Sequence, residues 1–506
     1  METERATSTA PALAARLEVL PMSNWQRWLT LIVGIGSFFD LYEVFLGGVL
    51  APVLAKQWTL DSTGKSAVIA CAFTGMFVGA NFMSLLADRF GRRNIFIINL
   101  ASYAVLSVAS AFSPNLTVFV ILRFLCGIGV GSELVLVDTY LAEFLPARLR
   151  GRYIAWAYTV GFLGVPVAAL FGAHVVAKNS FAGVDGWRWL LIAGGLGAVF
   201  VVAVQKTLPE SPRWLAARGR DADATAVVDD IERKVRRSLG RSKLDYEPTP
   251  QPAAEAVEQQ RVPLADMFHT YRSRTIMLWV FQILQTVGYY GFGSMAPLVL
   301  TAKGFTVTDS LGYAALTYIG YPVGSLVSIP LVERFERKHL IVVSAVGIGV
   351  FGLAFGLSTN TAVIVIAGFL LTMCSNVFSN AYHIYQTEIF PTSIRSSAIG
   401  MAYSLSRATS AGLPFAAIPA LDAFGSGWVF AGSAVLLGLL CLDVGLLGPR
   451  GTTGRALEEA AAKPLENFLS RTGHADSVSS PSTGLAAVGA HHGRGAVRER
   501  GAVSRT

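Results

Sequence analysis

The sequence predicts an all-α membrane protein that contains two copies of one multi-helix unit. Hydrophobic residues make up 53% of the chain and charged residues 15%, with a mean hydropathy of +0.50, whereas a soluble domain has about 25% charged residues. A single offset of 245 residues places Glu143 on Glu388 and Arg150 on Arg395. A repeat of this length in a mostly apolar chain indicates a duplicated helical bundle, with a binding site between the copies near the bilayer midplane.

Twelve apolar segments are long enough to cross the membrane as helices, which takes about 20 residues each. The six segments of the N-terminal bundle, expected over 27–208, lie near 27–55, 66–87, 94–113, 116–143, 150–177 and 187–208. The six of the C-terminal bundle, expected over 274–447, lie near 274–302, 309–332, 338–358, 361–390, 395–421 and 425–447.

Three polar regions lie outside these segments. Residues 1–26 lack the apolar stretch of a signal peptide, so we expect a short cytoplasmic tail. The central region, 209–273, carries both signs of charge; its first part, Trp214–Leu239, has a helical period that suits a helix along the membrane surface. Residues 448–506 are rich in Gly, Ala, Ser and Arg without an apolar period, which is typical of a disordered tail.

The positions of basic residues predict the orientation. Arginines follow the second, fourth, eighth and tenth segments, all on the side of the central region and both termini. By the positive-inside rule this side faces the cytoplasm. The expected location of the protein is the inner or plasma membrane. Because the basic residues cluster at segment ends, the net charge of +8 does not indicate a nucleic-acid partner.

Two loops carry a repeated charged motif. Ser84-Leu85-Leu86-Ala87-Asp88-Arg89-Phe90-Gly91-Arg92-Arg93 resembles the signature loop of the major facilitator superfamily, with Ser84 where that family usually has glycine, and Glu333-Arg334-Phe335-Glu336-Arg337-Lys338 is a degenerate second copy. The resemblance covers about residues 27–447. It implies two six-helix bundles around a central cavity and transport by alternating access. Asp88 is expected to cap a helix end and to pair with arginines.

Further motifs narrow the branch. Pro209-Glu210-Ser211-Pro212-Arg213-Trp214-Leu215 resembles a signature of sugar porters and organic-ion transporters, and Glu143-Phe144-Leu145-Pro146 and Glu388-Ile389-Phe390-Pro391 are similar to the cytoplasmic gate of that subgroup. The residues expected to form the cytoplasmic gate are Asp88, Arg89, Arg92, Glu143, Arg150, Glu333, Arg334, Arg337, Glu388 and Arg395.

Two acids and one arginine are candidates for proton coupling. Asp40 and Glu43 lie on one face of the first segment, and Asp40-Leu41-Tyr42-Glu43 resembles the acidic motif of aromatic-acid:proton symporters, with Leu41 and Glu43 as departures. Arg123 begins the fourth segment, where relatives carry an arginine that pairs with the first-helix acid. A carboxylate beside it holds a proton in one state and a salt bridge in another. The alternative is a purely structural ion pair between Asp40 and Arg123.

Arg407 lies in the middle of the eleventh segment. A guanidinium at this depth is expected to face the cavity and to bind an anion. We favour a substrate carboxylate as its partner; the alternative is an acid on another helix.

Further polar and aromatic residues suit a ring-bearing substrate. Asp138 and His383 are related by the same offset of 245 residues, and both are substrate candidates. The other candidates, near them and in the seventh segment, are Gln282, Gln285, Tyr289 and Tyr382. Aromatic and amide groups stack on and hydrogen-bond to such ligands. The alternative role for each is to bind neighbouring helices together; for His383, titration near neutral pH and a satisfied core position remain open.

The sequence therefore favours a proton-coupled importer of a small organic acid, such as an aromatic or nicotinate-like carboxylate. A sugar or polyol:proton symporter is the alternative, and an efflux antiporter or a non-transporting sensor is less favoured. No enzyme motif, metal cluster or cofactor site stands out, and one chain already provides both bundles, so we expect a functional monomer.

Overall fold

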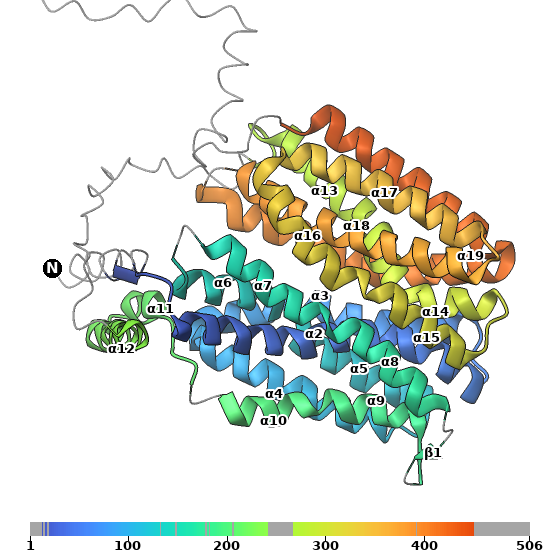
Figure 1. The fold of residues 1–506 in the computed structure, drawn as a ribbon, viewed down its shortest axis with the longest axis horizontal. Helices are drawn as coiled ribbons and strands as arrows, with labels where there is room; N and C mark the ends of the chain where they lie inside the picture. The colour runs from blue at the N-terminus through green and yellow to red at the C-terminus, as the bar shows by residue number, and fades with distance from the viewer. Residues whose placement is uncertain are drawn as a thin grey trace, which may run out of the picture. The chain divides into compact units, whose positions relative to one another are not determined.

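The computed structural model describes residues 13, 16, 17, 20–131, 133–146, 149–177, 180, 181, 183–204, 207–240, 267–390 and 392–449. All of them fall within one compact unit, residues 1–461. Figure 1 shows that the described chain is built almost wholly from long helices that run roughly alongside one another.

The N-terminal half contains six membrane segments, and within the described residues two of them are divided at a turn, at Leu163 and Gly195. They are α2 (Asn24–Gln57), α3 (Ser62–Phe90), α4 (Arg92–Ala111), α5 with α6 (Leu116–Gly131 and Glu133–Phe144), α7 with α8 (Arg150–Phe162 and Gly164–Ala177), and α9 with α10 (Gly186–Gly194 and Leu196–Val204). A short antiparallel ribbon of β1 (Ser180–Phe181) and β2 (Val184–Asp185) lies between α8 and α9.

The C-terminal half repeats this pattern. Its elements are α13 (Arg272–Thr286), the π-helix η2 (Val287–Gly291) and α14 (Phe292–Ala302), then α15 (Val307–Tyr318) with α16 (Gly320–Arg334), α17 (Arg337–Leu357), α18 (Thr361–Glu388) and α19 (Thr392–Leu447). The φ of Gly425 is +80°, so α19 breaks there into two segments. A left-handed backbone of this kind favours glycine.

The predicted fold class, twelve helical segments in two six-helix bundles, is confirmed. Eight stretches of the described chain are individually long and apolar enough to cross a membrane. The break in α19 divides one of them into two segments, and α5–α6, α9–α10 and α13–η2–α14 complete the twelve.

Glycines allow neighbouring helices to approach closely. Gly75 and Gly79 of α3 face Gly127 and Gly131 of α5, and a Cβ added at any of the four would collide with backbone atoms of the other helix. Because apolar burial between helices gives little driving force inside lipid, close backbone packing of this kind supplies the attraction.

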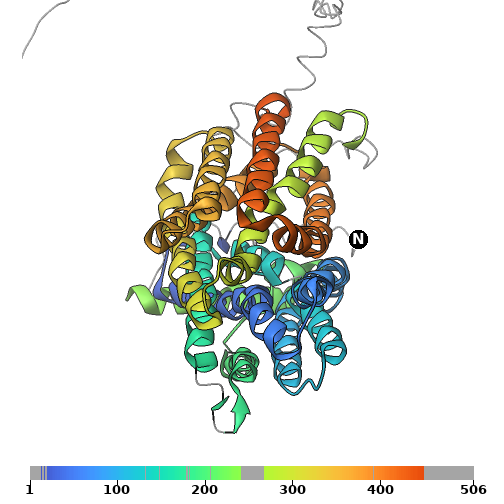
Figure 2. The same cartoon turned by 90° about the vertical axis from the view of Figure 1, so that its right-hand side faces the viewer.

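The two halves meet through α2 with α14, α8 with α15, and α3 with α19. Figure 2 shows the blue-to-green half beside the yellow-to-red half, with their helices seen end-on. At the end that carries the β-ribbon, Lys65 of α3 lies 3.2 Å from the carboxylate of Asp422 of α19, and Ser62 donates to the same group at 2.6 Å. These contacts join the halves at this end.

The region after the sixth segment packs on the N-terminal half. It contains α11 (Pro212–Ala217) and α12 (Asp221–Leu239), and the apolar face of α12 is buried in one cluster with Leu13, Leu17 and Leu20. Arg16 donates to Asp229 at 2.6 Å and to Glu232 at 2.9 Å. The helix expected within Trp214–Leu239 therefore exists, and part of the expected N-terminal tail packs beside it.

Expectations for residues 241–266 and for the tail from 450 onward lie outside the described residues. The boundaries of the five expected regions stay predictions.

Candidate substrate and proton sites

An ion pair between α2 and α5 lies at the centre of the N-terminal half. Arg123 donates through Nη1 to Oε2 of Glu43 and through Nη2 to the backbone oxygen of Glu43 at 2.9 Å. Ser107 of α4 donates to Oε1 of the same carboxylate at 2.6 Å. Glu43 and Arg123 are each 1% exposed. The expected pairing of Arg123 with Asp40 is therefore wrong: the arginine pairs with the acid one helical turn further along α2.

Asp40 occupies a different environment. It is fully buried, and its Oδ1 accepts a hydrogen bond of 2.6 Å from the hydroxyl of Tyr103. Its Oδ2 has no hydrogen-bond partner among the described residues. Burying an ionised carboxylate without a counter-charge is costly, so this position suits a group that can carry a proton.

Helix spacing explains why the two acids have separate partners. Asp40 and Glu43 lie three residues apart on α2, and Tyr103 and Ser107 lie four residues apart on α4, so each acid faces its own hydroxyl. Gly194 of α9 closes the site from another side, because a Cβ there would collide with Oε1 of Glu43.

Arg407 of α19 lies in the C-terminal half and is fully buried. Its Nη2 donates to the hydroxyl of Tyr403, and its guanidinium carbon lies 4.8 Å from the ring centre of Tyr290 and 4.6 Å from that of Tyr403. Nε and Nη1 have no partner within the described part of the chain, where no acid forms an ion pair with this arginine. The guanidinium therefore has aromatic neighbours and two unused donors.

Hydrogen-bonded amides connect α13, α18 and α19. Gln282 donates to Gln386 at 3.2 Å, and Gln285 donates to Gln282 at 3.1 Å and to Ser406 at 2.9 Å. The amide nitrogen of Gln386 lies 3.3 Å from Nδ1 of His383. These contacts give Gln282 and Gln285 a role in binding helices together, although Oε1 of Gln285 has no partner among the described residues.

Aromatic rings from both halves gather beside this network. Tyr289 and Tyr290 of η2 meet edge to face at 4.7 Å, and Tyr290 lies 5.5 Å from Phe73 of α3. Tyr382 stacks on His383 at 4.4 Å. The sequence interpretation did not assign Tyr403 to the site, although its position one helical turn before Arg407 is a signal that such a contact forms.

Equivalent ion pairs occur in the two halves. Arg92 pairs with Glu143, and Nε of Arg337 lies 3.5 Å from Oε1 of Glu388. Both members of the first pair map onto the second through the 245-residue offset. Each pair joins two helices of one half, so both halves carry the same charged contact at the end where α11 and α12 pack.

Glu210 caps the N-terminus of α4. Its Oε1 accepts hydrogen bonds from the backbone N–H of Arg93 at 3.1 Å and of Ser211 at 2.9 Å. Its Oε2 lies against Gly91, the residue directly before α4, which has a φ of +101°. A negative charge here is favourable because the helix N-terminus carries a partial positive charge. The capping role predicted for Asp88 falls on a side chain outside the described residues, and the role of Glu210 was not predicted.

The structure gives fewer contacts for the remaining predicted gate residues. Arg89 lies with its guanidinium carbon 5.5 Å from the ring centre of Phe90, and Arg150 begins α7. Glu333 and Arg334 lie exposed at the end of α16. The side chains of Asp88, Asp138 and Arg395 lie outside the described residues.

Comparison with known proteins identifies the family. A model described as "Sugar (and other) transporter" matches residues 29–463. The chain belongs to this family of major facilitator transporters. It is therefore an integral membrane protein that carries small molecules and is not an enzyme.

Several relatives of this sugar-porter-family transporter are similar along most of its length. It is 33% identical to "Putative metabolite transport protein YyaJ" of Bacillus subtilis, over 78% of this chain and 86% of the relative. It is 29% identical to "Niacin transporter NiaP" of Acinetobacter baylyi, over 88% and 99%. A solved structure of the proton:xylose symporter XylE has a TM-score of 0.67 and 22% identity, covering 85% of this chain and 97% of that one. This last likeness supports the fold.

Proposed function

We propose that this transporter imports a small organic acid, such as an aromatic or nicotinate-like carboxylate, together with protons by alternating access. The observation that carries the proposal is Arg407. A fully buried guanidinium with two unused N–H donors is an unneutralised positive charge, and such a group is stable only when an anion or a polarisable neighbour compensates it.

The surroundings of Arg407 favour an aromatic acid. A guanidinium forms strong hydrogen bonds to a carboxylate, and Nε and Nη1, on opposite sides of the group, are each free to donate to one. Tyr290 and Tyr403 offer ring faces beside the charge, and rings of this kind stack on a flat ligand. A relative named as a niacin transporter, 29% identical, supports the same substrate class.

Asp40 is the proposed proton carrier. Its unpartnered Oδ2 and complete burial favour a group that binds a proton in one conformation and releases it in another. Glu43 already neutralises Arg123, so we assign this pair the task of holding α2 against α5 beside the titrating acid. Protonation would thus change the charge of the site by one without breaking the ion pair.

A sugar or polyol:proton symporter is the second candidate. The matching family model is described as a sugar transporter, and Oε1 of Gln285 has no partner among the described residues, which leaves an acceptor for a ligand hydroxyl. The charge of Arg407 favours the acid, because a neutral sugar would leave the guanidinium uncompensated.

Orientation and assembly belong to the same proposal. The charge distribution supports an inner or plasma membrane location with both termini in the cytoplasm, and the presence of both bundles in one chain supports a functional monomer.

The substrate class is tested by uptake into proteoliposomes. Radiolabelled benzoates, nicotinate, citrate-type acids and hexoses are supplied outside at acidic pH, and the proton gradient is then collapsed with an ionophore. We expect an aromatic carboxylate to accumulate and to leak out after the collapse. If a hexose accumulates, and other sugars but not acids inhibit its uptake, the proposal of an organic-acid substrate is overturned and the sugar symporter is favoured.

A further inference from the structure

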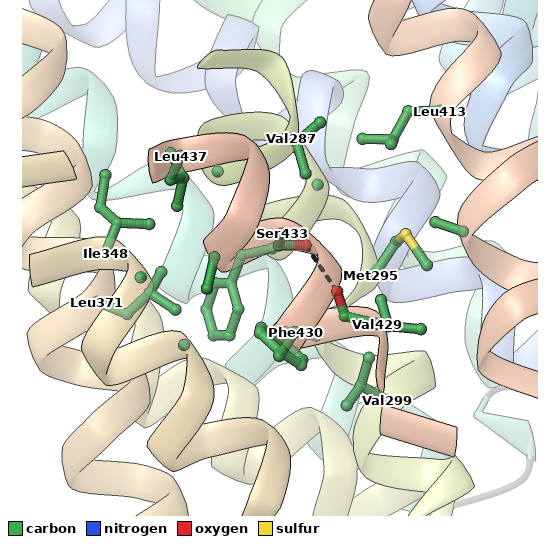
Figure 3. A pocket seen from close by; sticks show the side chains of 18 residues that line it. Val287, Met295, Val299, Ile348, Leu371, Leu413, Val429, Phe430, Ser433 and Leu437 are labelled. Atoms are coloured by element: carbon green, nitrogen blue, oxygen red, sulfur yellow. Dashed lines mark hydrogen bonds between the residues drawn. The ribbon is translucent and has the colours of Figure 1, made fainter. Parts of the chain in front are cut away.

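An apolar pocket lies inside the C-terminal half. It is lined by residues of η2, α14, α17, α18 and both parts of α19, and the room inside it that a water-sized sphere can occupy is about 40 Å³. Figure 3 shows Val287, Met295, Ile348 and Leu437 pointing toward this space from different helices. This room suits the thin end of a hydrocarbon chain, whereas pockets that hold a whole small-molecule ligand have volumes of about 300–1,000 Å³.

The lining excludes a polar ligand. Among the described residues, no charged side chain lines the pocket, and Ser433 contributes the single side-chain hydroxyl. That hydroxyl donates to the backbone oxygen of Val429 at 2.9 Å, the dashed line in Figure 3. An occupant would therefore find no free hydrogen-bonding side chain, and only a hydrocarbon group matches these walls.

The rim of the pocket faces the region that lipid occupies. Gly349 of α17 and Ala434 of α19 are half-buried lining residues. Next to them along the same helices, Val350 is 56% exposed and Val435 is 65% exposed. In a transmembrane bundle, exposed valines at this depth contact acyl chains, so acyl chains are the hydrocarbon available at the mouth of the pocket.

The π-helix η2 separates this pocket from the tyrosines beside Arg407. Val287, Gly288 and Gly291 of η2 line the pocket, whereas Tyr290 of the same turn lies under the guanidinium. Short π-helical turns inside α-helices are frequent at functional sites. Whatever fills the pocket therefore packs directly against the backbone that positions Tyr290.

We propose that this pocket is a lipid site that takes the end of one acyl chain from the surrounding bilayer. The bound chain supports η2 and thereby the contact of Tyr290 with Arg407; this second step rests on the proposed function of Arg407, and the first does not.

Photo-crosslinking tests the site directly. The full chain is reconstituted in phosphatidylcholine vesicles that contain a trace of phosphatidylcholine with a diazirine in its acyl chain, and crosslinked residues are mapped by mass spectrometry. The filling variant is Gly349→Leu, because a Cβ at 349 meets its nearest neighbour, Cβ of Ala434, at 3.8 Å and larger atoms extend into the space. The matched control is Gly432→Leu, because nothing lies within 4 Å of a Cβ there.

We expect crosslinks on the stretches 287–299 and 429–437 in the wild type. They fall about tenfold in Gly349→Leu, which corresponds to about 1.4 kcal/mol of binding free energy, and stay unchanged in Gly432→Leu. Crosslinks that spread evenly over the exposed valines of α17, or that survive in Gly349→Leu, overturn the lipid site. If Gly349→Leu does not fold, Ala434→Leu fills the same space and takes its place.

The KM for the substrate separates the two parts of the proposal, which are lipid binding in the pocket and support of η2 by the bound chain. Support of η2 by the chain predicts that Gly349→Leu changes the KM for the acid about threefold or more, the effect of about 0.7 kcal/mol or more, while Gly432→Leu does not. Lost crosslinking with an unchanged KM overturns the link to η2 and leaves the lipid site standing. Crosslinking needs no substrate, so a wrong substrate assignment would not affect it.

Discussion

Arg407→Gln removes the charge on which the proposed substrate contact depends. Two unused donors, Nε and Nη1, lie on opposite sides of the guanidinium, so one carboxylate reaches one of them, and a hydrogen bond to a charged group contributes about 1.5–3 kcal/mol. Losing this bond therefore costs about 1.5–3 kcal/mol, and since each 1.4 kcal/mol is a factor of ten, affinity falls by about 10-fold to 100-fold. Calorimetric titration of the purified protein with the transported acid measures this loss.

Folding should respond much less than affinity. The substitution forfeits cation–π contacts with Tyr290 and Tyr403, about 0.5–2 kcal/mol each, but it also removes a buried charge that lacks a counter-ion. We expect a thermal midpoint close to that of the wild type. Arg188→Gln is the control, because Arg188 bonds Asp185 at 3.1 Å near the β-ribbon, at a site given no role in binding. An unchanged dissociation constant in Arg407→Gln would refute the assignment.

Three further substitutions test the other parts of the account. Asp40→Asn should abolish accumulation driven by a pH gradient while exchange of labelled for unlabelled acid continues; persistent gradient-driven accumulation would exclude Asp40 as the carrier. Glu43→Gln leaves Arg123 buried without its partner, so chemical denaturation should show a loss of about 3–5 kcal/mol, and a loss below about 1 kcal/mol would mean that the pair is not structural. Glu210→Gln removes the anion at the N-terminus of α4, which should cost about 0.3–1 kcal/mol; a more stable variant would contradict the capping role.

The fold was predictable because the sequence patterns that indicate it extend over many residues. Each segment needs some twenty apolar residues, and the 245-residue offset repeats whole motifs, so local errors did not alter the topology. The same offset relates the Arg92–Glu143 and Arg337–Glu388 contacts, so repeated motifs identified these four residues as gate candidates, although not which of them would pair. Family resemblance then supplied the arrangement of the bundles.

The sequence did not show which of two acids, one helical turn apart on α2, pairs with Arg123. Asp40 and Glu43 lie on the same face of α2, and which of them meets Arg123 depends on where α4 places Tyr103 and Ser107. Neither hydroxyl carries a distinctive sequence signal. The resemblance also drew attention to Asp40, because the matching motif has its first acid there.

Long-range caps were missed for a similar reason. Glu210 belongs to the loop after α10, more than a hundred residues from the helix that it caps, so no local pattern connects the two. The pocket behind η2 depends on how five separate helices pack, and periodicity reports only which residues are apolar.

Lumenal pH recorded together with uptake of the labelled acid tests the central claim most directly. The full chain is reconstituted in vesicles loaded with a pH-sensitive dye, and nicotinate or the best acid of the panel is added without an imposed gradient. Proton-coupled import through Asp40 and Arg407 predicts that the lumen acidifies in step with uptake beyond the level of protein-free vesicles, and that Asp40→Asn takes up acid without this acidification. Acid uptake by the wild type with no accompanying proton entry would contradict the account.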